Sequence, residues 1–379
     1  MVIPQTSWAQ APTRRPFATS TTTQASRAAP SAAAPRAPLL PRAARRDPTA
    51  PSLKGRPASS ARRSRCVPLP FIALQNRFSA SLSKDTVALA RGYDGVCVFV
   101  NDKLEEETLQ QLAAVGVKLI VLRCAGFNNV NIEVAEKLNI KVYRVPAYSP
   151  QAVAEHALAL ILTLNRKTHK AYNRVRDGNF SLERLQGFNL QHKTIGVIGT
   201  GKIGASFCKI MQGFTDSILA YDKYENETVK AMGVKYVDLE YLLENSDIIS
   251  LHCPLTPETK YLIDSTSLRH LKNGCMLINT SRGALIHTGD AIEALKEGKL
   301  GYLGIDVYEQ EEHLFFRDLS ENIIQDDQIA RLISFPNVLI TSHQGFLTKE
   351  ALQEIAKVTF QNILDFQSGK ETENRVVSN

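Results

Sequence analysis

A run of three glycines near the middle of the chain most constrains the fold. Gly199, Gly201 and Gly204 come directly after an apolar, β-branched run at 194–198 and open a segment of helical period. A strand, a tight glycine turn and a helix in this order form a phosphate-binding unit, because the turn and the amides at the helix start approach a pyrophosphate. Asp222 ends the next apolar run, where a carboxylate accepts from both ribose hydroxyls and repels a 2′-phosphate. The sequence therefore predicts a site for NAD rather than NADP, although flavin and S-adenosylmethionine sites share parts of this pattern.

Short apolar runs alternate with longer segments of helical period along most of the chain, which indicates an α/β fold. The runs around the glycine turn are continuously apolar, as in strands that helices cover on both faces, so we expect a doubly wound Rossmann sheet there. Its predicted strands are 194–198, 217–221, 247–251, 276–279, 302–307 and 338–341. Three earlier runs, at 95–100, 117–122 and 141–145, predict a smaller, flavodoxin-like parallel sheet.

Two long helices are expected to link these parts. Pro150 starts a predicted helix at 150–164 that leads into the larger sheet, and the amphipathic segment 348–366 is expected to return to the smaller one. We therefore divide the chain into a leader (1–65), the N-terminal part of a substrate domain (66–147), an NAD-binding domain (148–346) and a C-terminal helix that returns to the substrate domain (347–379).

The excess of positive over negative charge is confined to the N-terminal segment. Residues 1–65 hold eleven Arg and one Lys against the single acid Asp47, so the net charge of +7 leaves −4 for residues 66–379. This balance argues against a nucleic-acid-binding protein. The leader is rich in Arg, Ser, Ala and Pro and has no apolar core, as in an organelle transit peptide. We expect import into a plastid (chloroplast), with a mitochondrion as the alternative, and cleavage near Cys66. A disordered basic tail would have the same composition.

Neither a metal site nor a membrane span is expected. The six cysteines are irregularly spaced, with no C-x-x-C pair and no His at metal-ligand spacing, so we interpret them as buried thiols. No apolar run reaches the length of a membrane helix.

Three side chains of complementary chemistry follow predicted strands. Arg282, Glu311 and His343 each come shortly after such a run, and the carboxyl ends of strands line the ligand crevice of a doubly wound sheet. A guanidinium binds a carboxylate through two hydrogen bonds, and a histidine protonates a carbonyl oxygen. Each residue alone has an ordinary structural explanation, but together they suit the reduction of a small 2-keto acid.

Longer strings between residues 83 and 369 carry a family resemblance. The runs 124–129, 144–148, 252–256, 279–283 and 343–346 read CAGFNN, RVPAY, HCPLT, NTSRG and HQGF. With these strings the chain resembles the D-isomer-specific 2-hydroxyacid dehydrogenases, and most of all the bacterial-type members that act on D-lactate. The resemblance implies reduction of pyruvate to D-lactate by NADH, in a homodimer.

The resemblance also implies a role for each reacting group. Arg282 would bind and polarise the substrate, and His343 would act as the general acid and base. Glu311 would pair with His343, and a neighbouring carboxylate favours the protonated imidazole near neutral pH.

Further residues are implied to contact the substrate and the cofactor. The backbone amides of Ala125 and Gly126 would hold the substrate carboxylate, while Tyr148 and Phe346 would bound its small side chain. The residues implied in contact with NAD, besides the three glycines and Asp222, are Lys202, Ile203, Cys253, Pro254, Thr280, Ser281, Arg282 and Asp306.

The resemblance breaks at the N-terminus. Members of the family begin with a strand and a helix before the segment that matches 71–78, whereas this chain has only the basic leader there. We therefore expect either that the smaller sheet lacks its first βα unit and exposes an edge, or that the start of this sequence differs from that of the natural protein.

Two alternative activities are compatible with the same residues. Hydroxypyruvate or glyoxylate reductases of this family use the same three reacting groups. An NAD-sensing binding protein of the corepressor type would keep these groups but would not turn over a small keto acid efficiently.

Overall fold

The structure, a computed structural model, describes residues 81–378. The predicted leader, Cys66 and the segment 71–78 lie outside the described residues, and so does the expected lack of a first βα unit. The described residues form two sheets that belong to one structural unit. Their mixed α/β architecture with parallel strands confirms the predicted fold class.

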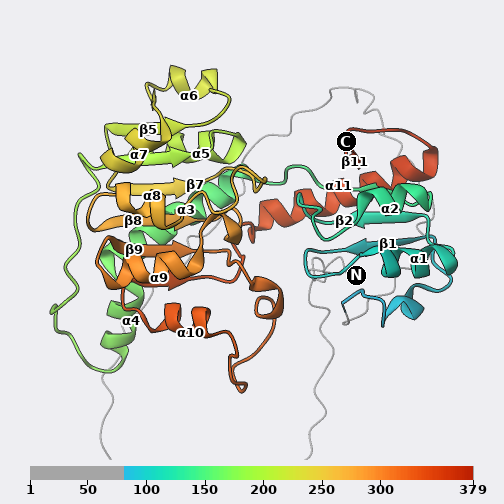
Figure 1. Ribbon diagram of the computed structural model, residues 1–379, viewed down its shortest axis with the longest axis horizontal. Coiled ribbons are helices and arrows are strands. Elements are labelled where there is room, and N and C mark those ends of the chain that lie inside the picture. Colours follow the sequence, from blue (N-terminus) through green and yellow to red (C-terminus); the bar gives the residue numbers. More distant parts are fainter. Residues whose placement is uncertain (1–80, 379) are drawn as a thin grey trace, which may run out of the picture. The chain divides into compact units, whose positions relative to one another are not determined.

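Seven parallel strands form the larger sheet, in the order β10-β9-β8-β7-β4-β5-β6 (Figure 1). They are β4 (Thr194–Ile198), β5 (Ser217–Tyr221), β6 (Lys235–Tyr236), β7 (Ile248–Leu251), β8 (Cys275–Asn279), β9 (Leu300–Ile305) and β10 (Val338–Ile340). The chain proceeds outwards from β4 through β5 and β6, and then crosses to β7 on the other side of β4. The strand order therefore reverses beside β4, and doubly wound sheets bind their ligands at such a switch point.

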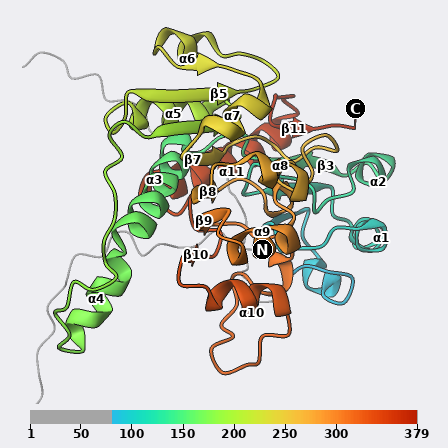
Figure 2. The same cartoon turned by 60° about the vertical axis from the view of Figure 1, so that its left-hand side comes forward.

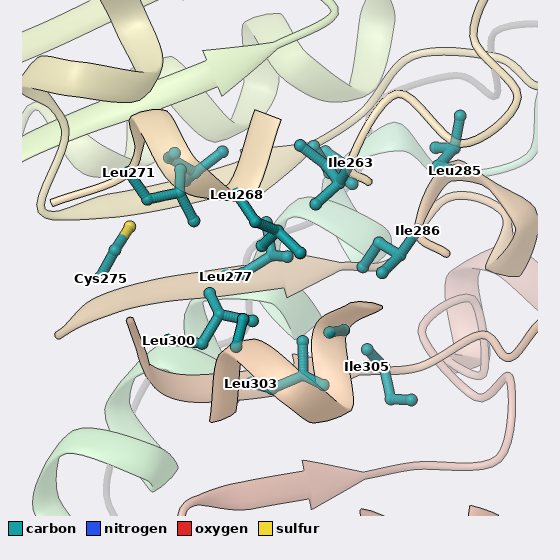
Figure 3. Close-up of a cluster of buried hydrophobic side chains, with 14 of the residues drawn as sticks. Ile263, Leu268, Leu271, Cys275, Leu277, Leu285, Ile286, Leu300, Leu303 and Ile305 are labelled. Carbon is teal, nitrogen blue, oxygen red and sulfur yellow. The ribbon is translucent and has the colours of Figure 1, made fainter. Parts of the chain in front are cut away.

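Helices cover both faces of this sheet, because successive residues of a strand point to opposite faces. In β8, Met276 and Ile278 join one core, whereas Cys275 and Leu277 join the other. The first core includes α3 (Pro150–Arg166), α5 (Lys202–Met211) and α6 (Glu227–Ala231). The second core, part of which Figure 3 shows, includes α7 (Leu239–Asn245), α8 (Ser265–His270), α9 (Thr288–Lys296) and α10 (Asp327–Ser334). This burial on two sides explains the continuously apolar runs of the sequence.

The smaller sheet has the order β1-β2-β3-β11. Its strands β1 (Gly95–Val98), β2 (Leu119–Leu122) and β3 (Lys141–Tyr143) are parallel, and β11 (Arg375–Val376) pairs antiparallel to β3. One face packs on the 3₁₀ helix η1 (Val87–Ala90), α1 (Glu106–Ala114) and α2 (Ile132–Lys137). On the other face, Ile363 and Phe366 of α11 (Lys349–Ser368) pack against Leu119, Val121 and Tyr143. The C-terminal segment thus contributes both a helix and a strand to this sheet.

Composition predicted buried thiols and no membrane-spanning helix. Cys124, Cys208, Cys253 and Cys275 are buried thiols as predicted, whereas Cys97 is half-buried. None of the described helices combines the length and the apolar character that crossing a bilayer requires.

A buried histidine lies between β7 and α5. His252 follows β7, its Nε2 is 2.9 Å from the Oγ of Ser250, and its ring centroid is 4.8 Å from that of Phe207. Burial lowers the pKa of His252 to about 3. The folded protein therefore holds this imidazole neutral at a pH where an unfolded chain would protonate it.

We expect His252 to make the protein less stable as the pH falls. Below about pH 6.5 the unfolded chain binds a proton at this residue and the folded chain does not. The free energy of unfolding therefore decreases by about 1.4 kcal/mol for each unit by which the pH falls, until the folded pKa is reached. When the pH is lowered from 6.5 to 5, the free energy of unfolding measured with urea should decrease by about 2 kcal/mol more in the wild type than in His252→Gln, because the variant has no titratable group at this position. Equal losses in the two proteins would contradict the assignment.

Candidate functional site

The glycine turn has the shape that a pyrophosphate needs. Gly199 has a left-handed φ of +94°, and a Cβ there would lie 2.4 Å from the backbone nitrogen of Cys253. A Cβ on Gly204 would lie 2.0 Å from the carbonyl oxygen of Gly199. The space beside Gly201 is open, and no side chain caps the first turn of α5, which begins at Lys202. Amides at a helix start, without a cap and beside open space, fit a phosphate group.

Asp222, directly after β5, is bound to the glycine turn. Its Oδ2 accepts from the backbone nitrogen of Thr200 at 2.6 Å and from the Thr200 hydroxyl at 3.1 Å. Its Oδ1 accepts from the backbone nitrogen of Tyr224 at 3.0 Å. A carboxylate has about four lone-pair positions, so about one of them stays open to a ribose hydroxyl.

The other predicted cofactor residues follow β7, β8 and β9. Cys253 is buried and Pro254 exposed after β7, and Ser281 is half-buried after β8. Thr280, also after β8, is buried, and its hydroxyl has no partner among residues 81–378. A buried polar atom without a partner costs free energy unless a ligand or water satisfies it. The donors and acceptors along this edge therefore fit a dinucleotide.

One cavity of about 620 Å³ collects every residue predicted to contact the substrate. Its lining includes Ala125, Gly126, Tyr148, Arg282, Glu311, His343 and Phe346. Arg282 lies over the backbone of Gly126, since a Cβ there would come within 2.9 Å of its Nη2. The amides of Ala125 and Gly126 donate to no acceptor within the described residues. The cavity thus combines a cation and two available donors, which suits a carboxylate.

His343 and Glu311 form a direct pair at the wall of this cavity. The Nδ1 of His343 is 2.8 Å from an oxygen of Glu311, whose other oxygen accepts from the backbone nitrogen of Tyr308 at 3.0 Å. Both side chains are about one quarter exposed or less, at 20% and 26%. Because Nδ1 is engaged, Nε2 is the nitrogen left for a ligand.

Asp306, directly after β9, holds the loop that carries His343. Its backbone oxygen accepts from the nitrogen of His343 at 2.7 Å, and its carboxylate accepts from the nitrogens of Gln344 at 2.9 Å and Gly345 at 2.7 Å. Burial would raise the pKa of Asp306, but hydrogen bonds from His156 and Thr341 outweigh it, so that this pKa is lowered. The contacts of this carboxylate are with the protein, although the resemblance implied contact with NAD.

Several residues of the cavity were not predicted. Phe99 follows β1, and its ring is 5.5 Å from that of Phe316 and 6.1 Å from that of Phe346. The guanidinium of Arg123 lies 3.8 Å over the same ring. Phe316 has a left-handed φ of +62° and also lies 6.1 Å from the His343 ring. Phe99 falls inside the predicted strand 95–100, where an aromatic residue indicates core packing, and Phe316 lies in an irregular segment, so neither position gave a signal for the site.

Comparisons with known proteins agree with this geometry. The family model described as D-isomer specific 2-hydroxyacid dehydrogenase, NAD binding domain, matches residues 158–345. A D-lactate dehydrogenase of Escherichia coli is 52% identical over 79% of this chain and 91% of its own length, and a 2-hydroxyacid dehydrogenase homolog of Haemophilus influenzae is 53% identical over the same shares. The solved structure of the pyruvate reductase of Chlamydomonas reinhardtii superposes with a TM-score of 0.75 at 47% identity, covering 78% of this chain and 89% of that one. The chain therefore belongs to the D-isomer-specific 2-hydroxyacid dehydrogenases, a family of NAD-dependent oxidoreductases.

Proposed function

We propose that this chain reduces pyruvate to D-lactate, with the balance pyruvate + NADH + H⁺ → D-lactate + NAD⁺. The observation that carries the proposal is that one cavity is lined by Arg282, the His343–Glu311 pair and the amides of Ala125 and Gly126, which have no acceptor within residues 81–378. Activities named for the similar proteins, D-lactate dehydrogenase and pyruvate reductase, support the same substrate.

In the proposed mechanism each group has one task. The amides of Ala125 and Gly126 and the guanidinium of Arg282 bind the carboxylate, and Arg282 also polarises the carbonyl next to it. The Nε2 of His343 gives its proton to the carbonyl oxygen, and the carboxylate of Glu311, 2.8 Å from Nδ1, fixes the orientation of the ring. Bound NADH supplies the hydride.

Aromatic rings suit the cavity to a substrate with a small apolar side chain. Tyr148 and Phe346 have ring centroids 5.9 Å apart, and Phe99 and Phe316 extend this wall. A methyl group buries apolar surface there without leaving a polar atom unpaired. This favours pyruvate over hydroxypyruvate, the substrate of the alternative activity.

Turnover by purified protein tests the function directly. NADH oxidation with pyruvate, hydroxypyruvate, glyoxylate and oxaloacetate should be most efficient with pyruvate, and chiral analysis should find D-lactate. His343→Ala and Arg282→Gln should each lose about 100-fold or more in kcat/KM while still binding NADH, because the lost groups act on the substrate. An NAD-sensing protein would bind NADH without efficient turnover, and near-normal pyruvate reduction by either variant would refute the mechanism.

A methyl group at Gly126 tests the placement of Arg282. In Gly126→Ala the new Cβ would lie 2.9 Å from Nη2 of Arg282, so the guanidinium must move. We expect the KM for pyruvate to rise about tenfold or more, since small displacements of a binding group are costly, and the Kd for NADH to stay the same. Gly213→Ala, where the new Cβ has an ordinary contact of 3.5 Å, is the control. A KM unchanged in Gly126→Ala would mean that Arg282 does not hold the carboxylate.

We also propose that residues 1–65 are a transit peptide that directs the protein to a plastid, with a mitochondrion as the alternative. The support is the composition of this segment, with eleven Arg, one Lys and one acid.

A homodimer is the third part of the proposal. Helix α4 (Thr168–Arg176) continues from the end of α3 (Figure 2) and has no buried residue. Tyr172, Val175, Phe180 and Leu182 on and after it are between 50% and 82% exposed. Monomers seldom expose so many large apolar side chains in one segment, so we propose that a second copy of the chain covers them.

Protein purified from isolated organelles tests both of these proposals. N-terminal sequencing should find a chain that begins near Cys66, and light scattering should give twice the mass of that chain. Recovery of intact protein with Met1 from the cell, or the mass of a single chain at working concentrations, would contradict the respective proposal.

A further inference from the structure

A chain of four hydrogen-bonding groups ends on the Asp222 carboxylate. The backbone nitrogen of Asn226 donates to the hydroxyl of Tyr236 at 2.9 Å, and this hydroxyl donates to that of Thr200 at 2.8 Å. The Thr200 hydroxyl donates to Oδ2 of Asp222 at 3.1 Å. Thr200 itself is almost fully buried, at 1% exposure.

The direction of every proton in this chain is fixed by its two ends. An ionised carboxylate only accepts, so the hydroxyl of Thr200 must donate to Asp222. A backbone N–H only donates, so the hydroxyl of Tyr236 must accept from Asn226. The proton of Tyr236 is then available only to Thr200. All three donors therefore point towards the carboxylate, and donors aligned in this way strengthen one another.

The same contacts connect the two parts of the site that recognise the adenosine half of the cofactor. Thr200 lies between Gly199 and Gly201, and its backbone nitrogen also donates to Asp222 at 2.6 Å. The side-chain nitrogen of Asn226 donates to the backbone oxygen of Thr200 at 2.8 Å. The glycine turn and the carboxylate are thereby held at one fixed separation.

The residues that build this chain come from two very short elements. Asn226 is the N-cap of α6, and Tyr236 is the last residue of β6, a strand of two residues at the edge of the sheet. Neither residue belongs to the glycine motif. Both act on the site only through Thr200 and Asp222.

We propose that Tyr236 is a positioning residue for cofactor choice, whose hydroxyl, through Thr200, orients the Asp222 carboxylate towards the ribose of NADH. Loss of this hydroxyl frees the Thr200 hydroxyl to rotate and loosens the carboxylate. Binding of NADH, which requires the carboxylate, should weaken, whereas NADPH, which the carboxylate repels, should bind equally well or better. The inference rests on NAD binding by this family and not on the identity of the keto acid.

Direct binding of the two cofactors to Tyr236→Phe tests the proposal. Titration calorimetry without a keto acid should give a Kd for NADH about three- to tenfold higher than that of the wild type, as expected when a bond of a charged network is lost. The Kd for NADPH should be unchanged or lower, so that the preference for NADH falls. In turnover assays KM for NADH should rise, and kcat at saturating NADH should stay within about twofold, because the reacting groups are untouched.

Two further variants separate positioning from a general effect on folding. Thr200→Val removes the hydroxyl but keeps the backbone N–H to Asp222, and it should shift the two Kd values in the same direction as Tyr236→Phe. The double variant should be no worse than the poorer single one, because both remove the same chain. Tyr241→Phe is the control, since the Tyr241 hydroxyl has no hydrogen bond within residues 81–378.

A Kd for NADH within twofold of the wild type in Tyr236→Phe, or equal weakening of NADH and NADPH, would overturn the proposal. If Tyr236→Phe fails to fold, Thr200→Val decides by the same criterion. Because no keto acid is present in the binding experiment, a failure of pyruvate reduction leaves its result intact.

Discussion

The register of the larger parallel sheet is the constraint on which the site depends. Across six strands, backbone pairing puts Tyr221, Ile198, Leu251, Asn279, Ile305 and Ile340 in one row. The next residues along the chain, Asp222, Gly199, His252, Thr280, Asp306 and Thr341, therefore emerge along one edge. Segments far apart in sequence are aligned by main-chain hydrogen bonds. A slip of one residue in any strand would turn its side chains to the opposite face.

The position of His343 shows how the fold supports a conformation that the residue itself does not favour. Its φ of +50° lies in the left-handed region, which costs about 1–3 kcal/mol for a residue other than glycine. Asp306 offsets this cost, because its backbone oxygen and its carboxylate bind three successive amides of the loop. His156 of α3 and Thr341 also donate to that carboxylate. The backbone of His343 is thus held by Asp306, while Glu311 holds only its ring.

Sequence patterns predicted the elements with strong local signals. The glycine turn, the apolar central strands and the long helices α3 and α11 agree with the structure within a few residues. The predicted strand 302–307 is displaced from β9, because Val307 is buried in the loop after the strand and extends the apolar run. β6 and β11 have two residues each, too few to show any periodicity.

The parts of the site that could not be predicted depend on contacts between distant segments. Phe99 and Phe316 meet only through the fold, and an aromatic residue next to a strand is usually a core residue. Tyr236 and Asn226 likewise reach Thr200 across 36 and 26 positions of the sequence. The polar groups that we propose for the reaction stood out in the sequence because their chemistry is rare at strand ends, and they line one cavity. The groups that orient them are of common residue types, so their role becomes evident only from the residues that they contact in the fold.

The last residues of the chain set the order in which the protein can fold. All seven strands of the larger sheet lie between Thr194 and Ile340, so this part is complete before α11 has been made. The smaller sheet begins much earlier, yet β3 has no partner on one side, and Leu119, Val121 and Tyr143 have no cover, until α11 and β11 arrive. An unpaired strand edge beside exposed apolar side chains favours association with other chains. A chain still attached to the ribosome therefore exposes an unpaired sheet edge from the synthesis of β3 until α11 and β11 have emerged.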